Sequence, residues 1–311
     1  MNSVAAAAFH IYSTVMTRHQ NRLRLPLAVA ILSSATLTFS GAARAQDASR
    51  WDGDARSTAR LIAGARTADA PYRAGIEIKL KPGWHTYWRY PGDAGVPPQF
   101  DFAGSQNLKA VEVHWPTPRR IPEAGLIAIG YDRDLILPLA VTPLDKSKPV
   151  ALRLKLNYAV CEKLCVPAEA KVELAFAGAP NSKDGLQPVL AGAPAQDAPL
   201  AAAEARVPRI RALGEGDGLA IRSVRREAGD RPHLVVEIAA PGTGPVDLFA
   251  EGPTDQWALP LPEATGGASP PLQRFTVELD GAPPGETYEG ALITLTAVQG
   301  GEAIEVKARI D

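Results

Sequence analysis

The sequence contains few of the residues from which enzymes commonly build catalytic or metal sites. Its 311 residues include only two cysteines, two methionines and five histidines. Three local signatures are missing: the phosphate-binding Gly-x-x-x-x-Gly-Lys, the zinc-binding His-Glu-x-x-His and the Gly-x-Ser-x-Gly nucleophile elbow. Their absence argues against a P-loop nucleotide-binding protein, a zinc protease of that type and an α/β-hydrolase.

The N-terminal segment has the pattern of a secretory signal peptide. Three arginines between residues 18 and 24 precede an apolar stretch from Leu25 to Phe39, and Ala43-Arg44-Ala45 supplies small residues for cleavage. About 15 apolar residues are too few to cross a bilayer, so a membrane anchor is the weaker interpretation. We expect residues 1–45 to be removed and the mature protein to be in a bacterial periplasm.

The mature chain also lacks a basic tract and a long hydrophobic run. The signal segment carries four arginines and no acidic residue, so 29 basic and 34 acidic residues remain, a net charge of −5. A mildly acidic chain of this kind lacks the basic patch with which proteins bind nucleic acid. No later segment approaches roughly 18 uninterrupted apolar residues, so we expect no membrane span in the mature chain.

Glycine and proline are plentiful, 55 residues in all, and the apolar residues alternate in short runs. In Tyr72–Leu80, for example, every second residue is apolar, and Lys81-Pro82-Gly83 follows as a turn. The same pattern predicts four further strands in the first half of the chain: Val111–Trp115, Leu135–Val141, Val150–Val160 and Ala168–Phe176. Helical periodicity is nearly absent there. The sequence therefore predicts an all-β fold of antiparallel β-sandwiches.

Short strand patterns also occur in the second half of the mature chain, after a linker. Residues 177–206 are rich in Ala, Pro and Gly and predict a linker, with a helical turn at Ala201–Ala205. Six more strands are expected: Leu219–Val224, Leu234–Ile238, Val246–Phe249, Phe275–Leu279, Ala291–Val298 and Ile304–Ile310. We predict a sandwich domain at 46–176, the linker, and a second sandwich domain at 207–311.

The only two cysteines, Cys161 and Cys165, lie in the short connection between two alternating segments. The pair is therefore expected in a hairpin, not at a helix N-terminus where a thiolate would be stabilised. In an oxidising compartment two such close cysteines are expected to bond to each other. A five-residue loop gains only about 2 kcal/mol from a disulfide, so a redox function is favoured over a structural staple.

A metal site at the cysteines is a third hypothesis. A Cys-x-x-x-Cys pair suits copper(I), which prefers thiolate and thioether ligands. Both methionines, Met1 and Met16, precede the cleavage point, so the mature chain offers no thioether. His85, His114 and His233 are far apart in sequence and are expected at surfaces or strand edges. We therefore expect no metal and no cofactor.

Aromatic residues crowd one segment before the cysteines. Trp84, Tyr87, Trp88 and Tyr90 lie in a stretch rich in Gly and Pro, where a strand can bury only one of its faces. Core packing accounts for some of them. Others are available to shield a reactive sulfur pair or to contact a partner.

Several motifs in this order resemble a known family. They are Pro82-Gly83-Trp84-His85-Thr86-Tyr87-Trp88, Pro91-Gly92-Asp93-Ala94-Gly95, Trp115-Pro116, Gly130-Tyr131, and Tyr158-x-x-Cys161 followed by Cys165-x-Pro167. They resemble the N-terminal periplasmic domain of DsbD-type transmembrane thiol–disulfide reductases, especially the branch represented by the copper-sensitivity suppressor ScsB. The resemblance covers about residues 60–176 and continues more loosely through Leu248-Phe249-Ala250-Glu251-Gly252-Pro253.

The resemblance implies an immunoglobulin-like sandwich with a redox-active cysteine pair. Cys161 and Cys165 match that pair by position. The family also has a loop whose aromatic tip caps the disulfide, and Gly130-Tyr131-Asp132 falls where that loop is expected. Tyr131 is then the candidate cap and Asp132 its neighbour, with Trp88 and Tyr87 as further shielding residues.

The resemblance also implies a function. It predicts a protein-disulfide reductase type of thiol–disulfide oxidoreductase that relays electrons to or from periplasmic thioredoxin-fold proteins. The family's transmembrane and C-terminal thioredoxin-like modules are not found in this sequence, so a separate membrane protein is expected to donate the electrons. The alternative is a non-enzymatic periplasmic binding module, with a structural disulfide and a role in copper tolerance.

Overall fold

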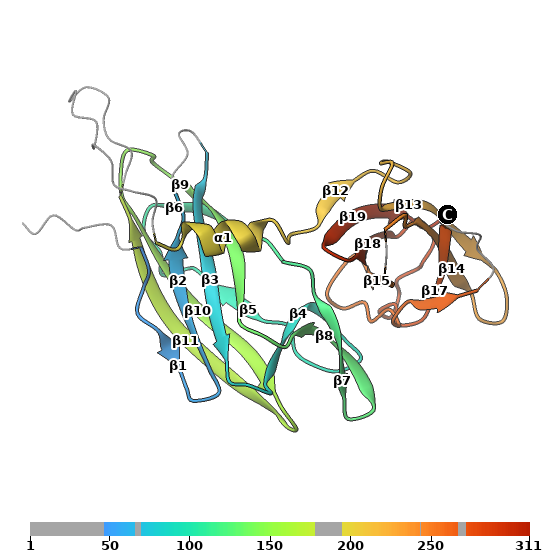
Figure 1. Ribbon diagram of the computed structural model, residues 1–311, viewed down its shortest axis with the longest axis horizontal. Coiled ribbons are helices and arrows are strands. Elements are labelled where there is room, and N and C mark those ends of the chain that lie inside the picture. The colour runs from blue at the N-terminus through green and yellow to red at the C-terminus, as the bar shows by residue number, and fades with distance from the viewer. Residues whose placement is uncertain (1–46, 66–69, 178–194, 243, 267–271) are drawn as a thin grey trace, which may run out of the picture. The chain divides into compact units, whose positions relative to one another are not determined.

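A computed structural model describes residues 47–65, 70–177, 195–242, 244–266 and 272–311 (Figure 1). The expected signal peptide, residues 1–45, and residues 178–194 of the expected linker lie outside these ranges. The described chain forms four β-sheets and a single helix, α1. Two sheets are built within residues 52–176 and two within residues 209–309.

The first two sheets are antiparallel throughout. One has the order β1 (Asp52–Gly53), β2 (Ser57–Ala63), β3 (Tyr72–Leu80), β9 (Leu135–Pro143), β6 (Leu108–Val113). The other has the order β11 (Cys165–Phe176), β10 (Val150–Cys161), β4 (His85–Gly92), β8 (Leu126–Tyr131), β7 (Arg119–Glu123), with β5 (Gln99–Asp101) also paired to β10. All five strands expected in this half are present. The sequence patterns did not predict β1, β2, β4, β5, β7 or β8.

Alternation along the strands builds the core between these two sheets. Ile76 and Ile78 of β3 and Leu152, Leu154 and Leu156 of β10 are at most 2% exposed and share one hydrophobic cluster. Fully burying a side chain of this size stabilises the fold by roughly 1.5–3 kcal/mol. The regular i, i+2 spacing in the sequence is therefore the direct cause of the two facing layers.

One end of the second sheet is covered on both of its faces. The first four residues of β4, His85 to Trp88, are all buried. Trp88 joins the main core, whereas Tyr87 packs on the opposite face in a small cluster with Ala128, Ala159 and Cys161. This small cluster positions the functional site.

The close approach of β4 and β8 at this end depends on a glycine. A Cβ atom on Gly130 would lie 2.1 Å from the carbonyl oxygen of Thr86, which is far inside contact distance. Any side chain at this position would force the two strands apart.

The remaining sheets have four strands each. One has the order β12 (Arg209–Arg211), β19 (Glu302–Arg309), β18 (Leu292–Gln299), β15 (Val246–Glu251), in which β12 and β19 are parallel. The other has the order β13 (Ala220–Glu227), β14 (His233–Ala239), β17 (Leu272–Glu278), β16 (Glu263–Thr265), all antiparallel. The six strands expected here are all present, and the prediction of an all-β, immunoglobulin-like class is confirmed.

Part of the expected linker is packed against the first sheet. Helix α1 (Asp197–Glu204) buries Leu200 completely, and Arg73 of β3 forms ion pairs of 2.6 Å with both Asp197 and Glu204. The helical turn expected at Ala201–Ala205 is thus the end of a longer helix. Its acidic residues hold it on the sheet, so this part of the linker is not a free connector.

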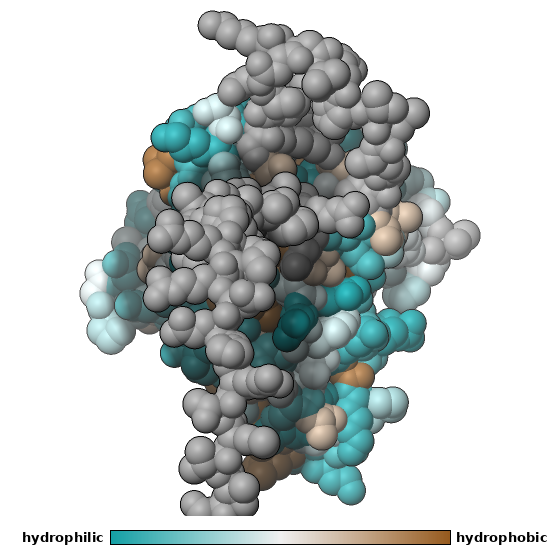
Figure 2. Space-filling view, turned by 90° about the vertical axis from the view of Figure 1, so that its left-hand side faces the viewer, coloured by the Kyte–Doolittle hydropathy of each residue, from teal (hydrophilic) through white to brown (hydrophobic). Residues whose placement is uncertain are grey.

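On the face drawn in Figure 2, described hydrophobic side chains lie in small separate areas among hydrophilic ones. Among the described residues, no helix is long and apolar enough to cross a bilayer.

Candidate functional site

The two cysteines face each other at the end of a β-hairpin. Strands β10 and β11 pair along their whole length, and the last pair in register is Cys161 with Cys165. Their Sγ atoms are 2.7 Å apart, with both residues in the free thiol form. The expected hairpin position is therefore confirmed. The residues differ in accessibility: Cys161 is 1% exposed, whereas Cys165 lies at the surface.

A carboxylate, Glu123, touches both thiols. Its Oε1 accepts hydrogen bonds from Cys161 Sγ at 3.0 Å and from Cys165 Sγ at 2.7 Å. Glu123 is the last residue of β7, and the β7–β8 hairpin carries it over the cysteines. Glu123 has no signal in the local sequence, because nothing relates a residue 38 positions before Cys161 to that cysteine.

Two residues of β4 complete the cluster. His85 Nε2 lies 3.1 Å from Glu123 Oε2, and the Tyr87 hydroxyl donates to the same oxygen at 3.1 Å. The Tyr87 hydroxyl is also 2.9 Å from Cys165 Sγ. The two rings pack edge to face at 5.5 Å. Because His85 is directly opposite Cys161 in the β4–β10 pairing, sheet register brings all these groups together.

His85 was expected at a surface or strand edge, and this expectation is wrong. The residue is only 5% exposed and belongs to the cluster around the cysteines. The sequence pattern failed because β4 is covered on both faces at this point, so its apolar and polar residues do not alternate.

Tyr87 is held in place by a glycine loop. A Cβ atom on Gly95 would lie 2.4 Å from the Tyr87 ring, and Gly95 has φ +118°, a backbone conformation that other residues rarely adopt. The Pro91–Gly95 motif thus allows the chain to pack directly against Tyr87. Of the four expected shielding residues, Tyr87 is the one that the structure brings to the sulfurs.

Tyr131, the expected cap, lies elsewhere. It pairs with Thr86, one residue out of step with the Tyr87–Gly130 pair, and its side chain therefore points to the opposite face of the sheet. There it is 5% exposed, belongs to the main core and donates a hydrogen bond to the Pro116 carbonyl at 2.7 Å. We correct the expected position accordingly: Tyr131 is a core residue in this structure.

The other two expected shielding residues also contact different partners. Trp88 is fully buried in the main core. Asp132 is exposed and forms a 2.7 Å ion pair with Arg119. The expected loop at Gly130–Asp132 is mostly the end of strand β8, and the residue that contacts both cysteines is instead Glu123, at the end of β7.

The surroundings shift the pKa values of Cys161 and Glu123 in opposite directions. Burial raises the pKa of Cys161 to about 12, and the hydrogen bond from Cys165 and the negative Glu123 act in the same direction. Burial alone would also raise the pKa of Glu123, but hydrogen bonds from Cys161, Cys165, His85 and Tyr87 outweigh it and lower that pKa to about 2. At neutral pH the site therefore holds a carboxylate and a protonated Cys161.

The contribution of Cys161 to stability follows from this direction. Its pKa in the folded dithiol form lies above the ordinary value of 9.0. A raised pKa stabilises the folded state fully below the unfolded value, and that stabilisation is lost as the pH rises from about 9 towards 12.

Replacing Glu123 by glutamine should lower the pKa of Cys161 by at least about one unit, because the neutral amide no longer opposes a negative sulfur. The measurement is the thiolate absorbance of the reduced protein as a function of pH, with Cys165 replaced by alanine in every sample. Glu162→Gln is the matched control, since Glu162 adjoins Cys161 in sequence but is exposed. An equal shift in both variants would contradict a specific effect of Glu123.

Comparison with known proteins identifies the domain that carries this site. The family model described as "Thiol:disulfide interchange protein DsbD, N-terminal" matches residues 58–177. These residues form a DsbD-type N-terminal domain. Both cysteines and the three residues around them, Glu123, His85 and Tyr87, lie within the matched range.

The fold of the whole described chain has a counterpart among solved structures. The crystal structure of the N-terminal periplasmic domain of ScsB from Proteus mirabilis matches with a TM-score of 0.63 and 21% sequence identity, covering 85% of this chain and 98% of that chain. At this identity the likeness shows a shared fold. No curated protein sequence matches the chain. The DsbD-type domain is thus a thiol:disulfide interchange domain, with Cys161 and Cys165 as its only cysteines.

Proposed function

We propose that this protein is a periplasmic thiol–disulfide oxidoreductase that relays electrons to or from thioredoxin-fold partners through Cys161 and Cys165, with a separate membrane protein as electron donor. One observation carries the proposal: an exposed cysteine touches a buried one, at 2.7 Å between their Sγ atoms, inside a DsbD-type domain. Exchange needs one sulfur that partners can reach and a second one that resolves the mixed disulfide.

Cys165 is assigned the exchange with partners. It is exposed, whereas Cys161 is buried and its raised pKa keeps it protonated. When the reduced protein acts, the Cys165 thiolate attacks one sulfur of a partner disulfide, and the partner's other sulfur leaves as a thiolate. Cys161 then attacks Cys165 Sγ and expels the partner's first sulfur. The partner leaves as a dithiol, and the Cys161–Cys165 disulfide has formed.

Glu123 is assigned the transfer of the Cys161 proton in the step in which Cys161 resolves the mixed disulfide. Its Oε1 already accepts the hydrogen bond of the Cys161 thiol at 3.0 Å, so it lies on the path by which that proton leaves when the sulfur attacks. Its lowered pKa ensures that this carboxylate is ionised at neutral pH. Until the mixed disulfide forms, the same negative charge holds Cys161 in the inert thiol form.

Exposed leucines beside the pair support a protein partner. Leu164, in the loop between the cysteines, is 73% exposed, and Leu126, opposite Glu123 in the β7–β8 hairpin, is 49% exposed. Large exposed apolar side chains next to a reactive group are a common feature of docking sites. Together with the secretory signal pattern, they support periplasmic protein disulfides as substrates.

The reduction potential of the Cys161–Cys165 pair tests this function. We expect a potential less negative than about −300 mV, the approximate limit below which disulfides in secreted proteins behave as structural staples. The measurement is equilibration with glutathione redox buffers, followed by alkylation and mass analysis. A more negative value would contradict the exchange function and favour the alternative, a binding module with a structural disulfide.

A further inference from the structure

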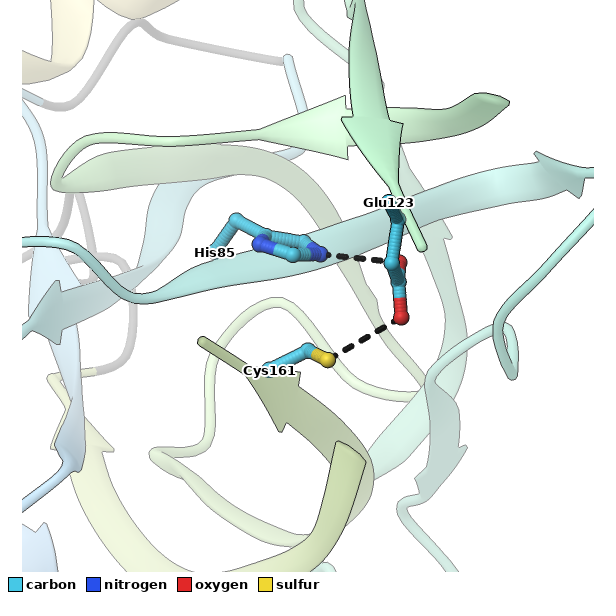
Figure 3. A group of neighbouring side chains, drawn as sticks. All are labelled: His85, Glu123 and Cys161. Carbon is cyan, nitrogen blue, oxygen red and sulfur yellow. Dashed lines mark hydrogen bonds and ion pairs between the residues drawn. The ribbon is translucent and has the colours of Figure 1, made fainter. Parts of the chain in front are cut away.

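Three potential metal ligands meet at one point of the DsbD-type domain. A ring nitrogen of His85, a carboxylate oxygen of Glu123 and the sulfur of Cys161 all lie within 4.8 Å of one another. Figure 3 shows the three side chains pointing towards one another from different strands, with Glu123 linked to each of the other two. His85 and Cys161 are buried and Glu123 is nearly so, which makes this a built site and not a chance surface cluster.

A fourth ligand is adjacent. Cys165 Sγ is 2.7 Å from Cys161 Sγ and 2.7 Å from Glu123 Oε1. Around a tetrahedral zinc ion with bonds of about 2.0–2.3 Å, neighbouring ligand atoms lie roughly 3.3–3.8 Å apart. The sulfurs and the carboxylate therefore need to separate by only about 1 Å to admit an ion. Cys165 is exposed at the start of β11, where such a movement disturbs no core packing.

We propose that the reduced form of this protein binds one Zn²⁺ ion through Cys161, Cys165, His85 and Glu123. The mixed set of two sulfurs, one nitrogen and one oxygen favours zinc, which accepts all three atom types in a tetrahedral site. Copper(I) prefers soft thiolate and thioether ligands to a carboxylate oxygen, and magnesium and calcium prefer oxygen ligands. The sequence analysis expected no metal because no histidine could be placed near the cysteines, and the β4–β10 register supplies that histidine.

A second shell is present for one of the ligands. The Tyr87 hydroxyl donates to Glu123 Oε2 at 3.1 Å, and the Tyr87 ring packs against His85. Hydrogen bonds of this kind orient a ligating carboxylate and are typical of protein zinc sites. Binding replaces two thiol protons by the metal, so two protons are released for each Zn²⁺ bound.

Zinc binding and disulfide formation exclude each other, because both use the same two sulfurs. When a disulfide of a partner protein oxidises the zinc form, the two thiolates become the Cys161–Cys165 disulfide and Zn²⁺ is released. The partner takes up the two electrons and two protons and leaves as a dithiol. The ion thus protects the reduced pair, and its release accompanies exchange. Metal binding itself does not depend on the proposed exchange function.

The test is zinc titration of the fully reduced protein in the absence of oxygen, in competition with a chromophoric chelator. We expect one ion per chain, at least a 100-fold weaker affinity in Cys161→Ala, and at least a tenfold weaker affinity in His85→Gln. His114→Gln is the matched control, since His114 is a half-exposed histidine outside the cluster, and it should bind as the wild type does. The oxidised protein should not bind.

Cobalt(II) gives an independent readout of the ligands. The cobalt form should show the absorption of a tetrahedral site with two thiolate ligands, and one thiolate in Cys165→Ala. Absence of zinc binding by the reduced wild type, or equal affinities of the His85→Gln and His114→Gln variants, would overturn the proposal. Since the reduction potential is measured in metal-free buffer, failure of the zinc site and failure of the exchange function are separate outcomes.

Discussion

Replacing Cys165 by alanine should abolish exchange with partner disulfides, a loss of at least about 10³-fold in rate. The exposed sulfur is then gone, and the remaining Cys161 is buried, where desolvation and the neighbouring Glu123 raise its pKa and keep it a thiol. Replacing Cys161 should have the opposite consequence. Cys165 still attacks, but no second sulfur resolves the product, so a mixed disulfide with a thioredoxin-fold protein accumulates.

The measurement is trapping of the covalent complex, followed by non-reducing electrophoresis and mass analysis of the linked peptide. Cys161→Ala and Cys165→Ala serve as controls for each other, and circular dichroism checks that both are folded. Equal trapping by the two variants would refute the assigned roles, and so would trapping mainly through Cys161.

Replacing Gly130 by alanine should lower the free energy of unfolding by about 3 kcal/mol, at the upper end of ordinary overpacking costs. The added Cβ would lie 2.1 Å from the Thr86 carbonyl oxygen, which is backbone and cannot rotate away. Strand β8 must therefore separate from β4. Because β8 forms the hairpin with β7, Glu123 moves with it, and the Glu123 contacts with both sulfurs should be lost as well.

Thermal and denaturant unfolding of the oxidised protein measures this effect, with an expected fall in Tm of roughly 10 °C. Gly229→Ala is the matched control, since a Cβ at Gly229 meets no atom within 4 Å. We expect that variant to stay within about 0.5 kcal/mol of the wild type. Similar losses in both variants would show that the β4–β8 approach is not the cause.

Much of the fold was readable from the sequence because its strands carry a local signal. Over residues 150–158 of β10 and along the partner strand Cys165–Phe176, one face is more buried than the other, so apolar and polar residues alternate. The hairpin between them also follows from local sequence, since only three residues separate the cysteines. The expected positions of Cys161 and Cys165 therefore needed no knowledge of the rest of the chain.

Two of the strands that the sequence patterns did not predict, β4 and β7, carry the rest of the site. His85 and Tyr87 lie on β4, which is buried on both faces, so its pattern has no period of two. Glu123 follows Pro122 at the end of a short strand with five residues, where proline obscures the strand pattern. The carboxylate that contacts the Cys161 sulfur is Glu123, whereas Glu162, which adjoins Cys161 in sequence, is exposed.

The class of fold, the hairpin and the identity of the two sulfurs follow from local sequence, because each depends on neighbours along the chain. Which side chains surround the sulfurs depends on how the strands assemble. The register between β4 and β10 sets which residue of β4 lies opposite Cys161. The alternation of side chains along each strand sets the face of the sheet on which each tyrosine lies. Tyr87 and Tyr131 are one residue out of step in the β4–β8 pairing. Tyr87 therefore lies beside the sulfurs, and Tyr131 lies in the core on the other face of the sheet. Register is a property of the assembled sheet, since it depends on all of its strands together.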